Sequence, residues 1–74
     1  MNWNEEAARI IKAAKSRNGA EWKDIADRLN NELGVELSAQ TIASRVNNGA
    51  FSFALALQIL AVLKVKEVEV PPVK

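Results

Sequence analysis

Apolar residues recur at spacings of three and four along most of the chain, a period that predicts amphipathic helices. The first predicted helix covers about residues 4–17, and the second covers residues 21–33. The apolar stripes are Trp3, Ala7, Ile10, Ile11 and Ala14 for the first helix, and Trp22, Ile25, Ala26, Leu29 and Leu33 for the second. Asn18-Gly19 and Gly34 follow the two stretches, and glycine is typical of a helix end.

The third and fourth predicted helices differ in polarity. The third, residues 39–48, lies between a candidate N-cap at Ser38 and Gly49, and its narrow apolar stripe is Ala39, Ile42, Ala43 and Val46. The fourth, residues 53–64 after the candidate cap Ser52, is apolar nearly all round. Such a helix must be covered on more than one side, so we expect a second copy of the chain to cover part of it. The candidate interface residues on this helix are Leu55, Ile59 and Val62, and its other face carries Phe53, Leu57, Leu60 and Ala61.

The period changes near the C-terminus. Val68 and Val70 alternate with Glu67 and Glu69, which is typical of a strand, and Pro71-Pro72 would end it. The two valines could pair with a symmetry mate and extend the dimer interface, or the segment could be an extended arm laid over the core. We therefore expect an all-α, compact four-helix domain over residues 1–66, followed by a short extended or β-like tail over residues 67–74.

Length and composition favour one small globular domain. The chain has 74 residues, of which 49% are hydrophobic, so it is too apolar to be disordered, but its core is small. A single core in so short a chain rarely contributes more than ~3–5 kcal/mol, which favours oligomerisation. The net charge of +1 does not itself indicate a nucleic-acid partner. However, no acidic residue lies between Glu36 and Glu67, and this stretch contains Arg45, Lys64 and Lys66.

Several functions are disfavoured by the residue types that the chain lacks. It has no cysteine and no histidine, so the usual metal ligands and the usual general base are missing. It has no glycine-rich phosphate loop either, and we expect no catalytic residue, metal, cofactor or small-molecule substrate. The most apolar run, residues 51–63, is shorter than the ~20 residues that span a bilayer, and the acidic N-terminus is unlike a signal peptide. These features predict a cytoplasmic protein without membrane contact, associated with the nucleoid if it binds DNA.

The polar surface of the third helix indicates a possible function. Its members are Gln40, Thr41, Ser44, Arg45, Asn47 and Asn48, a set of hydrogen-bonding groups with one positive charge and no negative one. Gln and Asn can pair with adenine, Arg with guanine, and Ser or Thr with either base, so this helix could read base edges. The alternative interpretation is a solvated helix whose polar side happens to lack acidic residues.

Four stretches in a fixed order resemble the lambda-repressor/Cro-like helix-turn-helix family, of the xenobiotic-response-element type. They are residues 10–19 (IIKAAKSRNG), 22–29 (WKDIADRL), 40–49 (QTIASRVNNG) and 56–65 (ALQILAVLKV). The chain also resembles an uncharacterised group of small bacterial domains of that type, which share the run Gly49-Ala50-Phe51-Ser52. The resemblance covers roughly residues 8–66 and implies a four-helix domain that binds DNA through its third helix.

The resemblance also implies roles for individual residues. In that family, residues early in the third helix contact base edges, and the matching positions are Ala39, Gln40, Thr41 and Ser44. It places Trp22 near a phosphate, and Asn48 and Ala50 at the DNA backbone. The chain departs from the family in three ways: residues 30–36 lengthen the connection between the second and third helices, Asn47 stands where Glu is frequent, and the tail replaces a fifth helix.

Two functional hypotheses follow. The first is a sequence-specific DNA-binding homodimer that acts in transcription regulation. Its phosphate contacts would come from Lys15, Arg17, Lys23 and Arg45. Because few phosphates would be neutralised, its affinity should depend only weakly on salt. The second is a protein-interaction or dimerisation module that keeps the helix-turn-helix core without binding DNA. The near-neutral charge and the apolar fourth helix support the second hypothesis.

Overall fold

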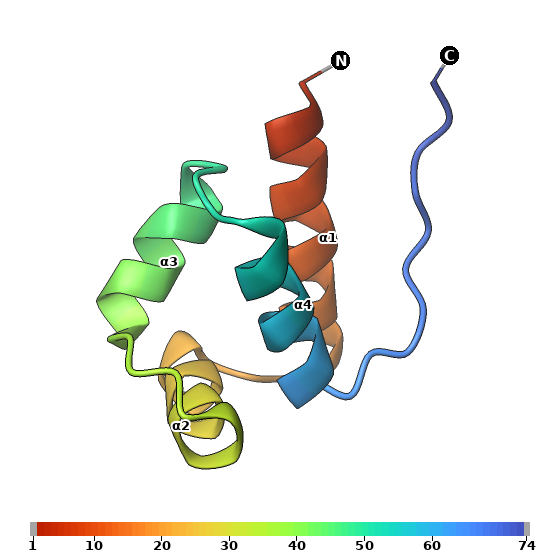
Figure 1. Ribbon diagram of the computed structural model, residues 1–74. Coiled ribbons are helices and arrows are strands. Elements are labelled where there is room, and N and C mark those ends of the chain that lie inside the picture. Colours follow the sequence, from red (N-terminus) through yellow and green to blue (C-terminus); the bar gives the residue numbers. More distant parts are fainter. Residues whose placement is uncertain (1, 74) are drawn as a thin grey trace.

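The structure is a computed structural model that describes residues 2–73. Within this range it contains four helices and no strand: α1 (Trp3–Arg17), α2 (Trp22–Leu33), α3 (Ala39–Asn47) and α4 (Phe53–Val62) (Figure 1). The predicted all-α, four-helix class is confirmed, and each predicted helix boundary lies within two residues of the observed one. Met1 and Lys74, the outer bounds of the predicted domain and tail, lie outside the described residues.

Polar side chains begin three of the helices, and two of these caps, Ser38 and Ser52, are the ones predicted from the sequence. The Asn2 side chain accepts hydrogen bonds from the first backbone amides of α1. At α3, the Ser38 Oγ accepts from the Thr41 N–H at 3.1 Å, and at α4 the Ser52 Oγ accepts from the Leu55 N–H at 3.0 Å. Each cap satisfies a backbone donor that has no partner inside its own helix, and so defines where the helix begins.

The end of α3 is a left-handed turn centred on Gly49, whose φ is 66°. The Gly49 N–H donates to the Val46 carbonyl at 3.1 Å, and the Ala50 N–H donates to the Arg45 carbonyl at 2.8 Å. This pair of bonds is a Schellman motif, which terminates a helix and reverses the chain. The same turn ends α4, but there the left-handed residue is Lys64, with φ 63°. Because no glycine marks this end, the end predicted from the sequence, residue 64, is two residues later than the observed end at Val62.

The core is formed by apolar side chains from all four helices. α2 packs against α3 and α4, while α1 packs against α4 and α3. The radius of gyration of 11.8 Å is close to the ~11 Å expected for a compact domain of this length. The buried residues are Ala8, Ile11, Ala14, Ala20, Ile25, Ala26, Leu29, Ile42, Val46, Leu55, Ile59, Val62 and Leu63.

The buried face of α4 corrects one prediction. Leu55, Ile59 and Val62 were expected at an interface between two copies, but they lie in the core of the single chain. The reason is that α1 and α2 pack against α4, so this apolar face is covered within the single chain. The exposed side of α4 instead carries Phe53, which is 78% exposed, and Leu57, which is 51% exposed.

The buried stripe of α1 is also rotated from the predicted one. Ile11 and Ala14 are buried as expected, but Ala8 is buried where Ala7 was predicted, and Trp3 is 48% exposed. A stripe at residues 8, 11 and 14 keeps the helical period, and the contacts of α1 with α4 and α3 select it over the neighbouring stripe that includes Trp3. A similar correction applies at the end of α2, where Leu33 is exposed.

The segment after α4 and its end turn, residues 65–73, which includes the described part of the tail, forms neither a helix nor a strand. Val65 is half-buried against the core, whereas Val68 and Val70 are exposed. α1 and α4 separate this segment from α3 (Figure 1). The strand alternative is therefore not found in the described residues, and pairing of Val68 and Val70 with a second copy stays a prediction.

None of the helices in residues 2–73 has both the length and the apolar character required to cross a membrane.

Candidate functional site

The orientation of α3 is set by two side chains on its inner face. Ile42 and Val46 are completely buried in the core, and Ala39 and Ala43 are half-buried beside them. Because residues four apart lie on the same side of a helix, these contacts turn the opposite side of α3 to solvent. The core therefore positions the polar face of α3 without using any of its polar side chains.

The exposed face of α3 contains most of the candidate base-contacting and backbone-contacting side chains. Gln40, Ser44, Arg45, Asn47 and Asn48 are exposed, and Thr41 is half-buried. Gln40, Ser44 and Asn47 lie four and three residues apart, so they form one row along the helix. No acidic side chain belongs to α3. The face thus presents hydrogen-bond donors and acceptors and one guanidinium group.

Two hydroxyl groups on α3 already have protein partners. The Ser38 Oγ donates to the Thr41 Oγ1 at 2.8 Å, which draws Thr41 toward the helix cap. Asn48 Nδ2 donates to the Ser44 Oγ at 3.4 Å. A hydroxyl that accepts one bond still has its own proton to donate. Thr41 and Ser44 can therefore still contact a ligand, whereas the Ala39 side chain offers only a methyl group.

The first turn of α2 brings two predicted phosphate contacts together. The Lys15 ammonium lies over the Trp22 ring, 5.0 Å from its centroid, in a cation–π arrangement. Arg17, the last residue of α1, and Lys23, in the first turn of α2, are both exposed. The cations named in the sequence analysis are consequently divided between two places, with Arg45 on α3 and the others near the α1–α2 turn.

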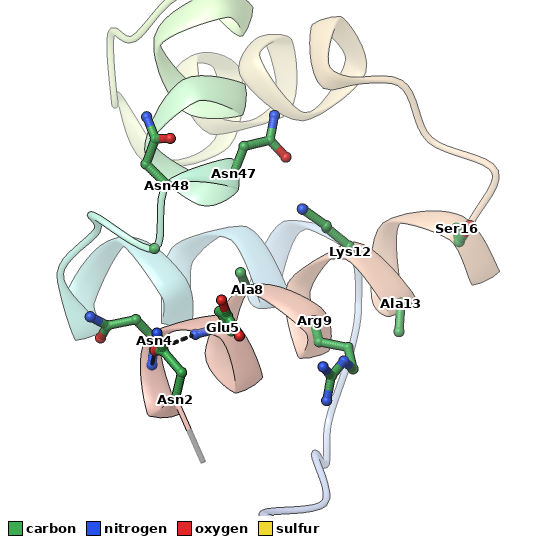
Figure 2. A pocket seen from close by; sticks show the side chains of 11 residues that line it. Asn2, Asn4, Glu5, Ala8, Arg9, Lys12, Ala13, Ser16, Asn47 and Asn48 are labelled. Carbon is green, nitrogen blue, oxygen red and sulfur yellow. Dashed lines mark hydrogen bonds between the residues drawn. The ribbon is translucent and has the colours of Figure 1, made fainter.

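A groove lies between α1 and the end of α3 (Figure 2). Its volume is about 730 Å³, and its walls include Lys12 and Ser16 from α1 together with Asn47 of α3 and Asn48, the residue that follows it. The candidate contacts drawn from the sequence include neither Lys12 nor Ser16. Their spacing of four shows that they share a face of α1, but nothing in the sequence places that face beside residue 47.

The electrostatic character of α2 is opposite to that of α1. Around Lys23, the exposed residues of α2 and its flanking segments include four acids, namely Glu21, Asp24, Asp27 and Glu36. Asp27 and Glu36 line a shallow hollow that also includes Lys23 and Ala39, at the start of α3. A polyanion approaching α3 would therefore meet negative charge on the α2 side.

A family model described as a domain of unknown function, DUF6471, matches residues 3–68 of the chain. The chain belongs to the DUF6471 family. The match extends from the start of α1 through α4 and into the tail, so the DUF6471 domain includes the whole helical core. Searches of curated proteins and of solved structures found no match.

Proposed function

We propose that this DUF6471 domain is a sequence-specific DNA-binding protein that acts as a homodimer in transcription regulation, with α3 in the major groove. The observation that carries the proposal is the exposed face of α3, where Gln40, Ser44 and Asn47 form a row without any acid. Carboxamides placed in this way can pair with the N6 and N7 atoms of adenine, and hydroxyl groups can contact several bases. The lambda-repressor-like order of motifs supports the same docking of the third helix.

The dimer is proposed because one copy of α3 is a short reading element. It spans only 9 residues, so one copy reaches few base pairs, and two copies related by a twofold axis would read two half-sites. Phe53 and Leu57 lie four residues apart on the exposed side of α4 and provide an apolar surface for the second copy. These residues take the place of the buried α4 residues that the sequence suggested.

The test is fluorescence anisotropy with labelled random and genomic duplexes at low and moderate salt. The molecular mass of the protein in solution is measured on the same sample to establish whether it is a dimer. Binding should weaken as salt rises and should favour some sequences. Gln40→Ala should reduce the preference among sequences, because each lost bidentate pair removes ~1–3 kcal/mol of discrimination. Arg45→Gln should weaken binding to all duplexes by a similar factor, since phosphate contacts carry no direct sequence information. Absence of any duplex binding at low salt would refute the proposal.

A second candidate function is a protein-interaction module that does not bind DNA. The specific observation in its favour is the exposure of Phe53 and Leu57, which are large apolar side chains on one helix face. Under this hypothesis, Phe53→Ser with Leu57→Ser abolishes association, while Gln40→Ala with Arg45→Ala leaves every interaction unchanged. Under the DNA-binding hypothesis, the substitutions in α3 abolish DNA binding and leave association intact.

A further inference from the structure

We propose that the groove between α1 and the end of α3 binds a backbone phosphate of duplex DNA through Lys12. This inference rests on the DNA-binding function proposed above and deepens it by naming where one DNA strand lies. It also changes the expected docking, because it assigns the main phosphate contact to Lys12 rather than to Trp22 or Lys23 at the start of α2.

The position of the groove supports this assignment. Asn47 belongs to the exposed row of α3 that begins at Gln40, and it also lines the groove. The reading face and the groove are therefore continuous surfaces. If Gln40 and Ser44 contact bases, the sugar-phosphate backbone of the same DNA strand lies beside them. The groove is a hollow that can accept this backbone.

The groove also contains the donors that a phosphate needs. Lys12 is exposed and takes part in no ion pair within residues 2–73, and its side chain points toward Asn47 (Figure 2). An ammonium group offers three donors, and the amide groups of Asn47 and Asn48 can add more. The nearby Arg9 is already paired with Glu6, so Lys12 is the available cation of this groove.

One carboxylate, that of Glu5, lines the groove and has to be considered. It lies seven residues before Lys12 on the same helix, a separation of about 10 Å along the helix axis. At that distance the repulsion between Glu5 and a phosphate at Lys12 is screened by salt, because the Debye length is ~8 Å at physiological ionic strength. The binding position is therefore at the Lys12–Asn47 end of the groove.

The α2 side of α3 is much less suited to a phosphate. Asp27 and Glu36 line the hollow that contains Lys23, and they oppose the charge of that lysine. A phosphate in this hollow would be repelled by both carboxylates, whereas the groove at Lys12 has one distant carboxylate. Electrostatics therefore favour a strand that runs over α1.

Three substitutions that each remove one positive charge provide the test. Lys12→Gln should weaken binding to specific and random duplexes by the same factor, and should reduce the slope of log K against log salt by about 0.9, the value for one phosphate. Lys66→Gln is the matched control, because α1 and α4 separate residues 65–73 from α3, and it should leave the slope unchanged. Lys23→Gln should reduce the slope less than Lys12→Gln. Lys12→Arg, which keeps the charge, should restore it.

The possible outcomes separate this inference from the function on which it rests. If the unaltered protein binds no duplex at low salt, the DNA-binding function itself is refuted. If it binds DNA but Lys12→Gln behaves like Lys66→Gln, or if Lys23→Gln has the larger effect, the phosphate site on α1 is wrong while the function stands. Circular dichroism of each variant confirms that the helices are intact.

Discussion

Gly49 is a residue at which backbone conformation and packing act together. Its φ is 66°, and a Cβ atom at this position would lie 2.8 Å from the Asn4 Cβ of α1. Gly19 has a similar φ of 62° but no neighbouring atom within 4 Å of its added Cβ. The two glycines therefore separate the cost of the left-handed backbone from the cost of a steric contact.

We expect Gly49→Ala to destabilise the protein more than Gly19→Ala. Both substitutions should lose ~1–2 kcal/mol because alanine is strained in the left-handed region. Gly49→Ala should lose a further ~1–3 kcal/mol, because α1 has to move away from the turn. Urea denaturation of the two variants gives both values, and equal losses would show that α1 does not press on the turn at Gly49.

Ser38 supports the first turn of the proposed reading helix. Its Oγ accepts a hydrogen bond from the Thr41 backbone and donates one to the Thr41 side chain. We expect Ser38→Ala to lower the free energy of unfolding by ~1 kcal/mol, whereas Ser38→Asp should keep most of the stability, since aspartate is a comparable N-cap. Denaturation midpoints would measure both changes. An alanine variant as stable as the aspartate variant would mean that this cap does not stabilise α3.

At the scale of the element, substitutions on the two apolar faces of α4 test which face belongs to the core. We expect Leu55→Ala to destabilise the chain by ~2–5 kcal/mol, because it leaves a cavity among buried side chains. Phe53→Ala removes a larger side chain but should change stability by less than about 0.5 kcal/mol, since its ring is mostly exposed. The comparison is made by urea denaturation at low protein concentration. A larger loss of stability for Phe53→Ala than for Leu55→Ala would mean that the face of α4 with Phe53, not the face with Leu55, is buried in the core.

At the scale of the whole molecule, the tail should be dispensable for folding. We expect a chain that ends at residue 66 to unfold within about 1 °C of the full chain, because exposed residues contribute little to stability. It keeps Val65, which packs against the core, and loses the exposed Val68 and Val70. Thermal denaturation measures the difference, and sedimentation velocity shows whether the truncated chain still associates. A large drop in melting temperature would mean that residues 67–74 belong to the domain.

The helices of this protein could be predicted from the sequence because their signals are local. Ser38 and Ser52 cap the helices that follow them, and Gly49 adopts the left-handed turn that its position indicated. The end of α4 was less predictable, because Lys64 takes a conformation usually adopted by glycine. Caps and glycine turns depend on bonds between residues a few positions apart, which is why a sequence reveals them.

The candidate site was predictable only in part. The polar face of α3 follows from its period, since burial of Ile42 and Val46 leaves the opposite side exposed. The groove beside that face depends on Lys12 and Asn47, which are 35 positions apart and come together only when α1 packs on α3. No periodic pattern contains such information.

The sequence by itself determined the number and polarity of the helices and most of their limits, because those depend on hydrogen bonds and side-chain spacing within about one turn. Only the tertiary structure decided which face of an apolar helix is buried. It put Leu55 and Ile59 inside the chain and left Phe53 exposed, although all three are strongly hydrophobic. That choice depends on how four helices pack around a small core. The free energy of burial is roughly proportional to the apolar area removed from water, and it does not by itself select which side chains are buried.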